Sequence, residues 1–176
     1  MESLTIIDQQ YKNGNFLVEY LKEKHEITLF IEAENNFKKN ILLSAASFYE
    51  KEVSDLIVKF AETQSNKNML IISIITEKAV NRQFHTYFDW GNSKNANKFF
   101  SIFGSDFKLK MVEKVKKDDK LDESIKAFLD IGHERNLLVH RNFAEIILEK
   151  TAEEIYELYK KAQYFISILK SELIIE

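Results

Sequence analysis

Residues 122–140 have the sequence DESIKAFLDIGHERNLLVH, in which apolar side chains recur with the period of an α-helix. At about 100° per residue, one face about 100° wide collects the residues suited to a core, namely Ile125, Phe128, Leu129, Gly132 and Val139. We therefore expect a helix with this face turned inward. Gly132 lowers the helix propensity by about 1 kcal/mol, which suggests that another element approaches it closely.

Three polar residues lie on the same face. Asn136 falls near its middle, Arg135 at one edge and His140 at the other. Burying such groups without partners would cost several kcal/mol, so each needs a partner or an open site. The end of this helix is therefore predicted to border a ligand cleft or a subunit interface.

The composition of the whole chain predicts an all-α fold. The chain has 176 residues with no proline and 4 glycines, whereas a sandwich or barrel of short strands needs a turn about every 8–12 residues. The length suits one domain, at residues 1–176. The lack of cysteine excludes disulfides, thiolate zinc sites and a cysteine nucleophile. Because the start also lacks a secretory signal, we expect a cytoplasmic protein without a membrane segment.

Helical spacing extends over most of the remaining chain. We expect helices at residues 3–24 and 25–64, with polar positions that favour interruptions near 13–15 and at 35–36 or 40. Residues 69–78 are isoleucine-rich, which suits a strand as well as a buried helix, and we predict the helix. Thr151 and Glu154 have the spacing of a capping box, so the last helix is expected to begin there.

A short aromatic-rich insertion at residues 84–103 interrupts the predicted bundle. Its side chains include Phe84, His85, Tyr87, Phe88, Trp90, Phe99, Phe100 and Phe103. We expect these rings to close the core as an aromatic clamp. The alternative is a platform on which the bases of single-stranded nucleic acid stack.

Lysines are concentrated at residues 107–120. Such a run is usually a solvated helix face, and the alternative is contact with phosphate, for which Lys116 and Lys117 are candidates. The net charge of −3 gives no general affinity for nucleic acid. Any such binding must therefore depend on a local patch.

Arginine, asparagine and histidine at residues 135–140 suit RNA cleavage without a metal ion. His140 can act as general acid or base near neutral pH, because the ordinary histidine pKa is near 6.5. Arg135 can hold a phosphate bidentately, and Asn136 can donate to a phosphoryl oxygen. The ribose 2′-OH would attack the adjacent phosphate and leave a cyclic phosphate. The alternative is structural, with these side chains satisfied by each other, by a carbonyl or by a carboxylate.

The spacing of Arg135 and His140 restricts how they could meet. On a straight helix they diverge by about 140° and about 7.5 Å. Either the helix ends at His140, or two copies of the segment face each other across a twofold axis. A zinc site is not favoured, because His133 has no second histidine four residues later.

The segment RNLLVHRNF at residues 135–143 resembles the signature of the HEPN superfamily, in which arginine and a polar residue precede histidine. The resemblance is to the RiboL-PSP-HEPN type. It includes SAASFYE at residues 44–50, FHTYFDW at 84–90 and FFSIFG at 99–104. It extends over about residues 25–172.

This resemblance implies an antiparallel α-helical bundle of the HEPN type that forms a homodimer, with paired segments lining a shared cleft. It implies an endoribonuclease that needs no metal or other cofactor, with a toxin or antiphage defence role and an antitoxin or defence-system partner. By position, Arg135 and His140 would be catalytic, supported by Asn136 and Glu50. Arg141 and His133 would bind RNA, together with the candidates Lys116 and Lys117. The alternative is a non-catalytic HEPN module for nucleic-acid binding or protein assembly.

Overall fold

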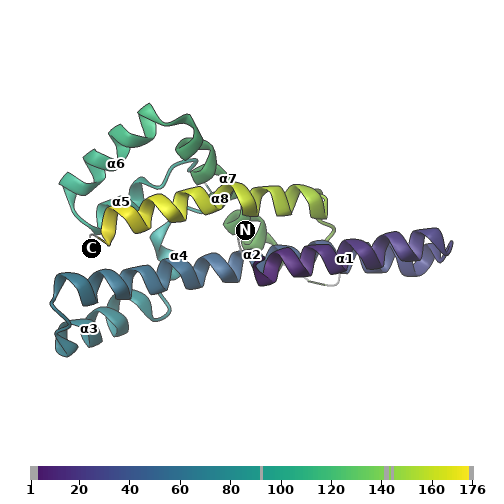
Figure 1. Cartoon of the computed structure of the whole chain (residues 1–176), viewed down its shortest axis with the longest axis horizontal. Coiled ribbons are helices and arrows are strands. Elements are labelled where there is room, and N and C mark those ends of the chain that lie inside the picture. Colours follow the sequence, from purple (N-terminus) through teal and green to yellow (C-terminus); the bar gives the residue numbers. More distant parts are fainter. Residues whose placement is uncertain (1–3, 92, 141–142, 144, 175–176) are drawn as a thin grey trace.

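The computed structural model describes residues 4–91, 93–140, 143 and 145–174. It is 81% helical and contains no strand within these residues (Figure 1). The predicted all-α fold is confirmed. In the same described ranges, no helix is long and apolar enough to cross a membrane.

Four long helices form the main body of the fold. Helices α1 (Ile6–Glu23) and α2 (Ile27–Gln64) form a hairpin, and their connected ends project beyond the rest of the bundle (Figure 1). Helix α8 (Ala152–Leu173) lies along α2 and packs extensively against α7 (Asp119–His140). The predicted capping box opens α8, because Thr151 and Glu154 each bond the other's backbone.

The interruptions expected in the first two helices do not occur. Helix α1 continues through residues 13–15 and α2 through residues 35–40. The glycine has a packing role instead, because a Cβ at Gly14 would lie 2.2 Å from Cε2 of Phe37. The missing side chain lets α1 and α2 approach closely.

The isoleucine-rich segment is helical, but the prediction that it is buried is wrong. It forms α3 (Met69–Ile75), and none of the residues of this helix is fully buried. A π-helical turn at Thr76–Val80 follows it. Leu70 is 83% exposed. Helix α3 packs against the end of α2, and most of its side chains are exposed.

The aromatic insertion closes the core, as predicted. It contributes α4 (Phe84–Tyr87) and α5 (Asn97–Ile102), and its buried Phe88 and Phe99 stack with ring centroids 4.9 Å apart. The ring of Phe88 also lies 4.8 Å from that of Phe128. Each such pair adds about 0.5–1.5 kcal/mol beyond area burial. Because Phe88 and Phe99 are buried, they offer no face for stacking bases.

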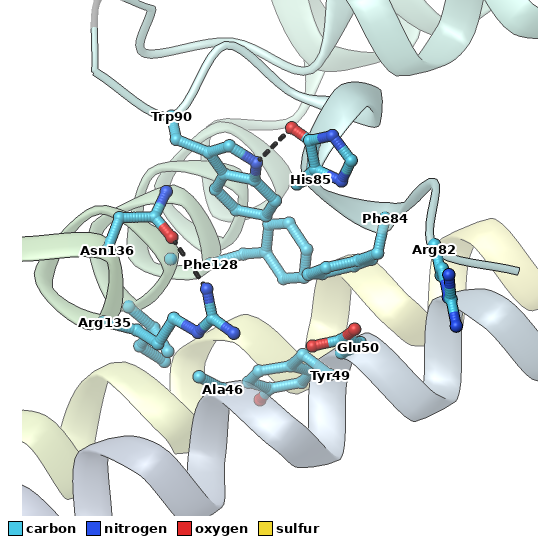
Figure 2. A pocket seen from close by; sticks show the side chains of 12 residues that line it. Ala46, Tyr49, Glu50, Arg82, Phe84, His85, Trp90, Phe128, Arg135 and Asn136 are labelled. Atoms are coloured by element: carbon cyan, nitrogen blue, oxygen red, sulfur yellow. Dashed lines mark hydrogen bonds between the residues drawn. The ribbon is translucent and has the colours of Figure 1, made fainter. Parts of the chain in front are cut away.

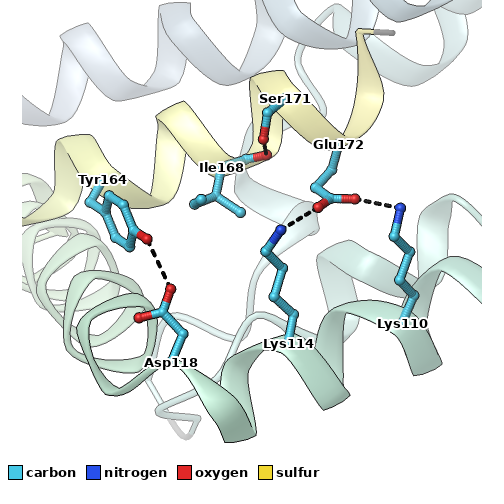
Figure 3. Close-up of polar contacts among 7 residues, drawn as sticks. All are labelled: Lys110, Lys114, Asp118, Tyr164, Ile168, Ser171 and Glu172. Atoms are coloured by element: carbon cyan, nitrogen blue, oxygen red, sulfur yellow. Dashed lines mark hydrogen bonds and ion pairs between the residues drawn. The ribbon is translucent and has the colours of Figure 1, made fainter.

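Helix α6 (Ser105–Lys117) is attached to α8 by polar contacts (Figure 3). Lys110 and Lys114 both pair with Glu172. Those two hydrogen bonds outweigh the effect of partial burial and lower the pKa of Glu172. Asp118, which separates α6 from α7, accepts a hydrogen bond from the hydroxyl of Tyr164 at 2.9 Å. Two lysines of the lysine-rich run, Lys110 and Lys114, therefore attach α6 to α8.

Candidate functional site

The end of α7 leaves the core. The helix buries both the expected Ile125 and Phe128 and the unexpected Ala127 and Ile131, because α2 and α8 contact it on two sides. Beyond Gly132 only one residue, Leu138, is buried. Val139, expected on the core face, is 45% exposed. The inward face of the last turns is thus narrower than predicted and is rotated toward Leu138.

A pocket lies where the aromatic insertion and α2 face the second half of α7 (Figure 2). It has a volume of about 330 Å³, within the range of small-ligand sites. Aromatic rings form much of its wall. Its polar and charged lining residues are Glu50, Arg82, His85, Arg135 and Asn136.

Arg135 and Asn136 point into this pocket from α7 (Figure 2). Both are half-buried, and Nη1 of Arg135 donates a hydrogen bond to Oδ1 of Asn136 at 3.1 Å. Among the residues that the structure describes, no carboxylate forms an ion pair with Arg135. The neighbouring carboxamide therefore orients a guanidinium whose charge remains available to an anionic ligand.

Glu50 lines the pocket from α2. It is exposed, and its carboxylate lies between the side chains of Arg135 and Arg82 in the view of Figure 2. The structure thus brings together three of the predicted site residues, Glu50, Arg135 and Asn136. A carboxylate only accepts hydrogen bonds, and guanidinium groups only donate them. The site therefore presents both kinds of group to a ligand.

Trp90 is fixed at the edge of the pocket by its neighbours. Its Nε1 donates to the carbonyl of His85 at 3.1 Å, and Nδ1 of His133 lies 3.1 Å from the carbonyl of Trp90. Its ring lies over Gly132, where a Cβ would be 2.1 Å from Cζ3 of the indole. The close approach predicted at Gly132 is confirmed, and the approaching element is the aromatic insertion.

Four of the other predicted site residues, His133, His140, Lys116 and Lys117, do not line the pocket. His140 is exposed at the end of α7, and His133 is half-buried beside the carbonyl of Trp90. Lys116 and Lys117 are exposed at the end of α6. Arg141 lies outside the described residues. The functional roles of these residues stay predictions.

The structure adds pocket residues that sequence reasoning did not select. Arg82 lines the pocket although no motif marked it, and His85, which the sequence marked only as part of the aromatic insertion, lines it as well. Lys39 is 5% exposed, and its Nζ donates to the carbonyl of Phe143 at 2.6 Å and lies 4.8 Å from the centre of that ring. This contact joins Phe143 to α2. No local sequence pattern could have indicated this contact, because Lys39 and Phe143 are 104 positions apart in the chain.

Acidic and histidine side chains are not gathered into a metal site in the described part of the chain. No group of three or more of them is close enough to hold an ion there. The predicted lack of a metal requirement is a question for experiment.

Comparison with known families gives one result. The RiboL-PSP-HEPN family model matches residues 14–174. The matched range contains every pocket-lining residue and the whole segment 135–140. No curated protein and no solved structure matches the chain.

Proposed function

The chain belongs to the RiboL-PSP-HEPN family, and from this premise we propose that it is an endoribonuclease that needs no metal ion. HEPN proteins are often ribonucleases. The observation that carries the proposal is the pocket in which Arg135, Asn136 and Glu50 meet beside an aromatic wall. We propose further that its cleavage of RNA serves as a toxin or in antiphage defence.

The proposed reaction uses groups whose chemistry suits a phosphodiester. Arg135 binds two phosphoryl oxygens and stabilises the charge that develops on them. Asn136 holds the guanidinium through Oδ1 and has its amide N–H groups left for the phosphate. His140 takes the proton of the ribose 2′-OH, whose oxygen attacks phosphorus. The bond to the 5′ oxygen breaks and that oxygen takes up, through a water molecule, the proton that His140 removed, which leaves a 2′,3′-cyclic phosphate and a 5′-OH. Glu50 contacts the substrate from the opposite wall.

A homodimer accounts for the position of His140. Within one protomer it lies at the exposed helix end, outside the pocket that contains Arg135. Three apolar side chains close to His140 in the sequence are exposed: Val139 and Phe143 at 45% each, and Ile147 at 76%. A second copy packed on these side chains by a twofold axis would cover apolar surface and bring each His140 toward the partner's pocket.

Cleavage of a single-stranded RNA or a tRNA in EDTA tests the proposed reaction. We expect products with cyclic phosphate ends, and a rate that falls about 10²–10⁴-fold in His140→Ala and in Arg135→Ala. His25→Asn is the matched control, because His25 is exposed in a turn with φ 59°, which asparagine tolerates. Activity lost in EDTA, or retained by His140→Ala, would contradict the mechanism.

Mixing the two inactive variants tests the dimer. When Arg135→Ala and His140→Ala are co-expressed, about half of the dimers contain one copy of each variant, and each mixed dimer has one intact pair across the axis. We expect about a quarter of the wild-type rate to return. If no activity returns, each site uses Arg135 and His140 of the same protomer.

A non-catalytic HEPN module that binds nucleic acid is the second candidate. The exposure of His140 outside the pocket favours it, because the pocket could then hold a ligand without cleaving it. Gel-shift binding of RNA without cleavage by the wild type would support this alternative. Growth arrest on expression, relieved by Arg135→Ala, would instead support a ribonuclease toxin.

A further inference from the structure

We propose that the pocket beside Arg135 binds one unstacked guanine base of the RNA, and that the protein therefore cleaves next to guanine. This inference rests on the proposed function for its RNA substrate. It assigns base recognition to Trp90, Glu50 and Arg82, which lie on different segments of the chain and meet only in the pocket.

The aromatic wall gives the pocket a surface for a planar ring. Trp90 is only partly buried, and its ring lies 5.3 Å from that of Phe84 and 5.8 Å from that of Phe128. Its bond to the carbonyl of His85 and its packing on Gly132 fix the indole before any ligand arrives. A fixed ring loses little freedom on binding, so the stacking contributes to affinity in full.

The size of the pocket limits what enters it. A volume of about 330 Å³ is at the small end for ligand sites. It suits a single base with its sugar at the mouth rather than a stretch of stacked nucleotides. Arg135, at the same pocket, is then placed to bind the phosphate attached to that nucleotide.

The charged groups at the pocket match the hydrogen-bonding edges of guanine. Glu50 offers only acceptors, and guanine is the base with two adjacent N–H donors, at N1 and N2, for one carboxylate. Adenine and cytosine each offer an amino group beside an acceptor, and uracil offers one N–H between two acceptors. Guanine O6 and N7 form an acceptor pair that a guanidinium binds bidentately.

Arg82 is the guanidinium free for that second edge. It is exposed and lies on the opposite side of Glu50 from Arg135 in Figure 2. Within the described ranges it makes no hydrogen bond or ion pair through its side chain. Its charge is thus not used to hold the fold together. The two arginines thus bind different parts of the nucleotide: Arg82 binds the base, and Arg135 binds the phosphate.

Fluorescence measures this binding directly, because Trp90 is the single tryptophan of the chain. In the His140→Ala protein, titration with GMP should quench the emission to saturation, with an affinity at least about tenfold higher than for AMP, CMP or UMP. Glu50→Gln should remove that preference, because an amide N–H would then face the N–H groups of the base. Glu32→Gln, an exposed carboxylate of α2 that does not line the pocket, is the matched control.

Trp90→Ala removes the signal, so its binding is measured by calorimetry. We expect GMP to bind about tenfold more weakly or worse. The inference would be overturned if GMP, AMP, CMP and UMP bound with equal affinity, or if GMP gave no saturable quenching. Either result would count against it whatever the RNA assay shows. Wild-type cleavage that ignores guanine would also overturn it and leave the ribonuclease in place. Selective GMP binding without any wild-type cleavage would support the pocket and reject the proposed reaction.

Discussion

The two halves of α7 differ in what they contribute to the protein. From Leu121 to Ile131 the helix faces the core on two sides, whereas from Gly132 onward Leu138 alone is buried and Arg135 and Asn136 face the pocket. The first half fixes the position of the helix, and the second half presents polar groups from it. Side chains on a rigidly packed element keep their geometry better than side chains on loops. This separation predicts that stability and activity respond to different substitutions.

The largest loss of stability is expected in the first half. Phe128 is 2% exposed and packs against the rings of Tyr49, Phe88 and Phe165. Phe128→Ala should lower the free energy of unfolding by about 3–5 kcal/mol, because it leaves a cavity between aromatic rings. Urea denaturation measures this change. Phe128→Leu is the control and should lose less, and a loss under about 1 kcal/mol for alanine would show that the core collapses around the site.

A smaller effect is expected at the boundary between the halves. Gly132→Ala would place a Cβ 2.1 Å from Trp90 Cζ3, so the indole must move. The overpacking should lower the free energy of unfolding by about 1–3 kcal/mol. This loss should exceed the gain of about 1 kcal/mol from the higher helix propensity of alanine. We expect lower stability and a red-shifted tryptophan emission.

Gly91→Ala is the control for this substitution, because nothing lies within 4 Å of a Cβ built there. Its emission should match the wild type. A Gly132→Ala protein that is more stable, with unchanged emission, would contradict the packing described for Trp90.

Asp118, at the start of α7, should make the free energy of unfolding decrease at acidic pH. Asp118 accepts hydrogen bonds from the N–H of Leu121 at 3.0 Å and from the hydroxyl of Tyr164, and these lower its pKa. A lowered carboxyl pKa stabilises the folded state fully above the unfolded value, about 3.9, and this contribution disappears as the pH falls through the folded pKa.

Asp118→Ala should therefore flatten the fall in stability from about pH 5 toward pH 2, measured as urea midpoints at each pH. Asp119→Ala, at an exposed neighbouring carboxylate, is the control and should keep the wild-type slope. Equal slopes in both variants would place the acid sensitivity elsewhere in the protein.

The smallest effect on stability is expected at the end of α7. His140 is exposed, so His140→Ala should change the free energy of unfolding by no more than about 0.5 kcal/mol, although we expect cleavage to be lost. Urea denaturation beside the RNA assay checks both. A loss above about 1 kcal/mol would show that His140 supports the fold, and the contrast between the two halves would weaken.

The sequence determined the helices and some of their details. The lack of proline, the apolar spacing and the capping box of Thr151 and Glu154 predicted an all-α chain, because helices form from local hydrogen bonds and local periodicity. The close approach at Gly132 also followed from one glycine on an apolar face. The resemblance at residues 135–143 indicated the family that the match over residues 14–174 establishes.

The tertiary structure alone decided which faces of those helices are covered. It left α3 and Val139 exposed, and it placed His140 outside the pocket that contains Arg135. It also brought Arg82, which precedes the aromatic insertion, to that pocket. Apolar periodicity shows that a face can be buried, but the partner that covers it comes from distant parts of the chain. The helices were therefore a local outcome, whereas the pocket depends on contacts that no single stretch of sequence contains.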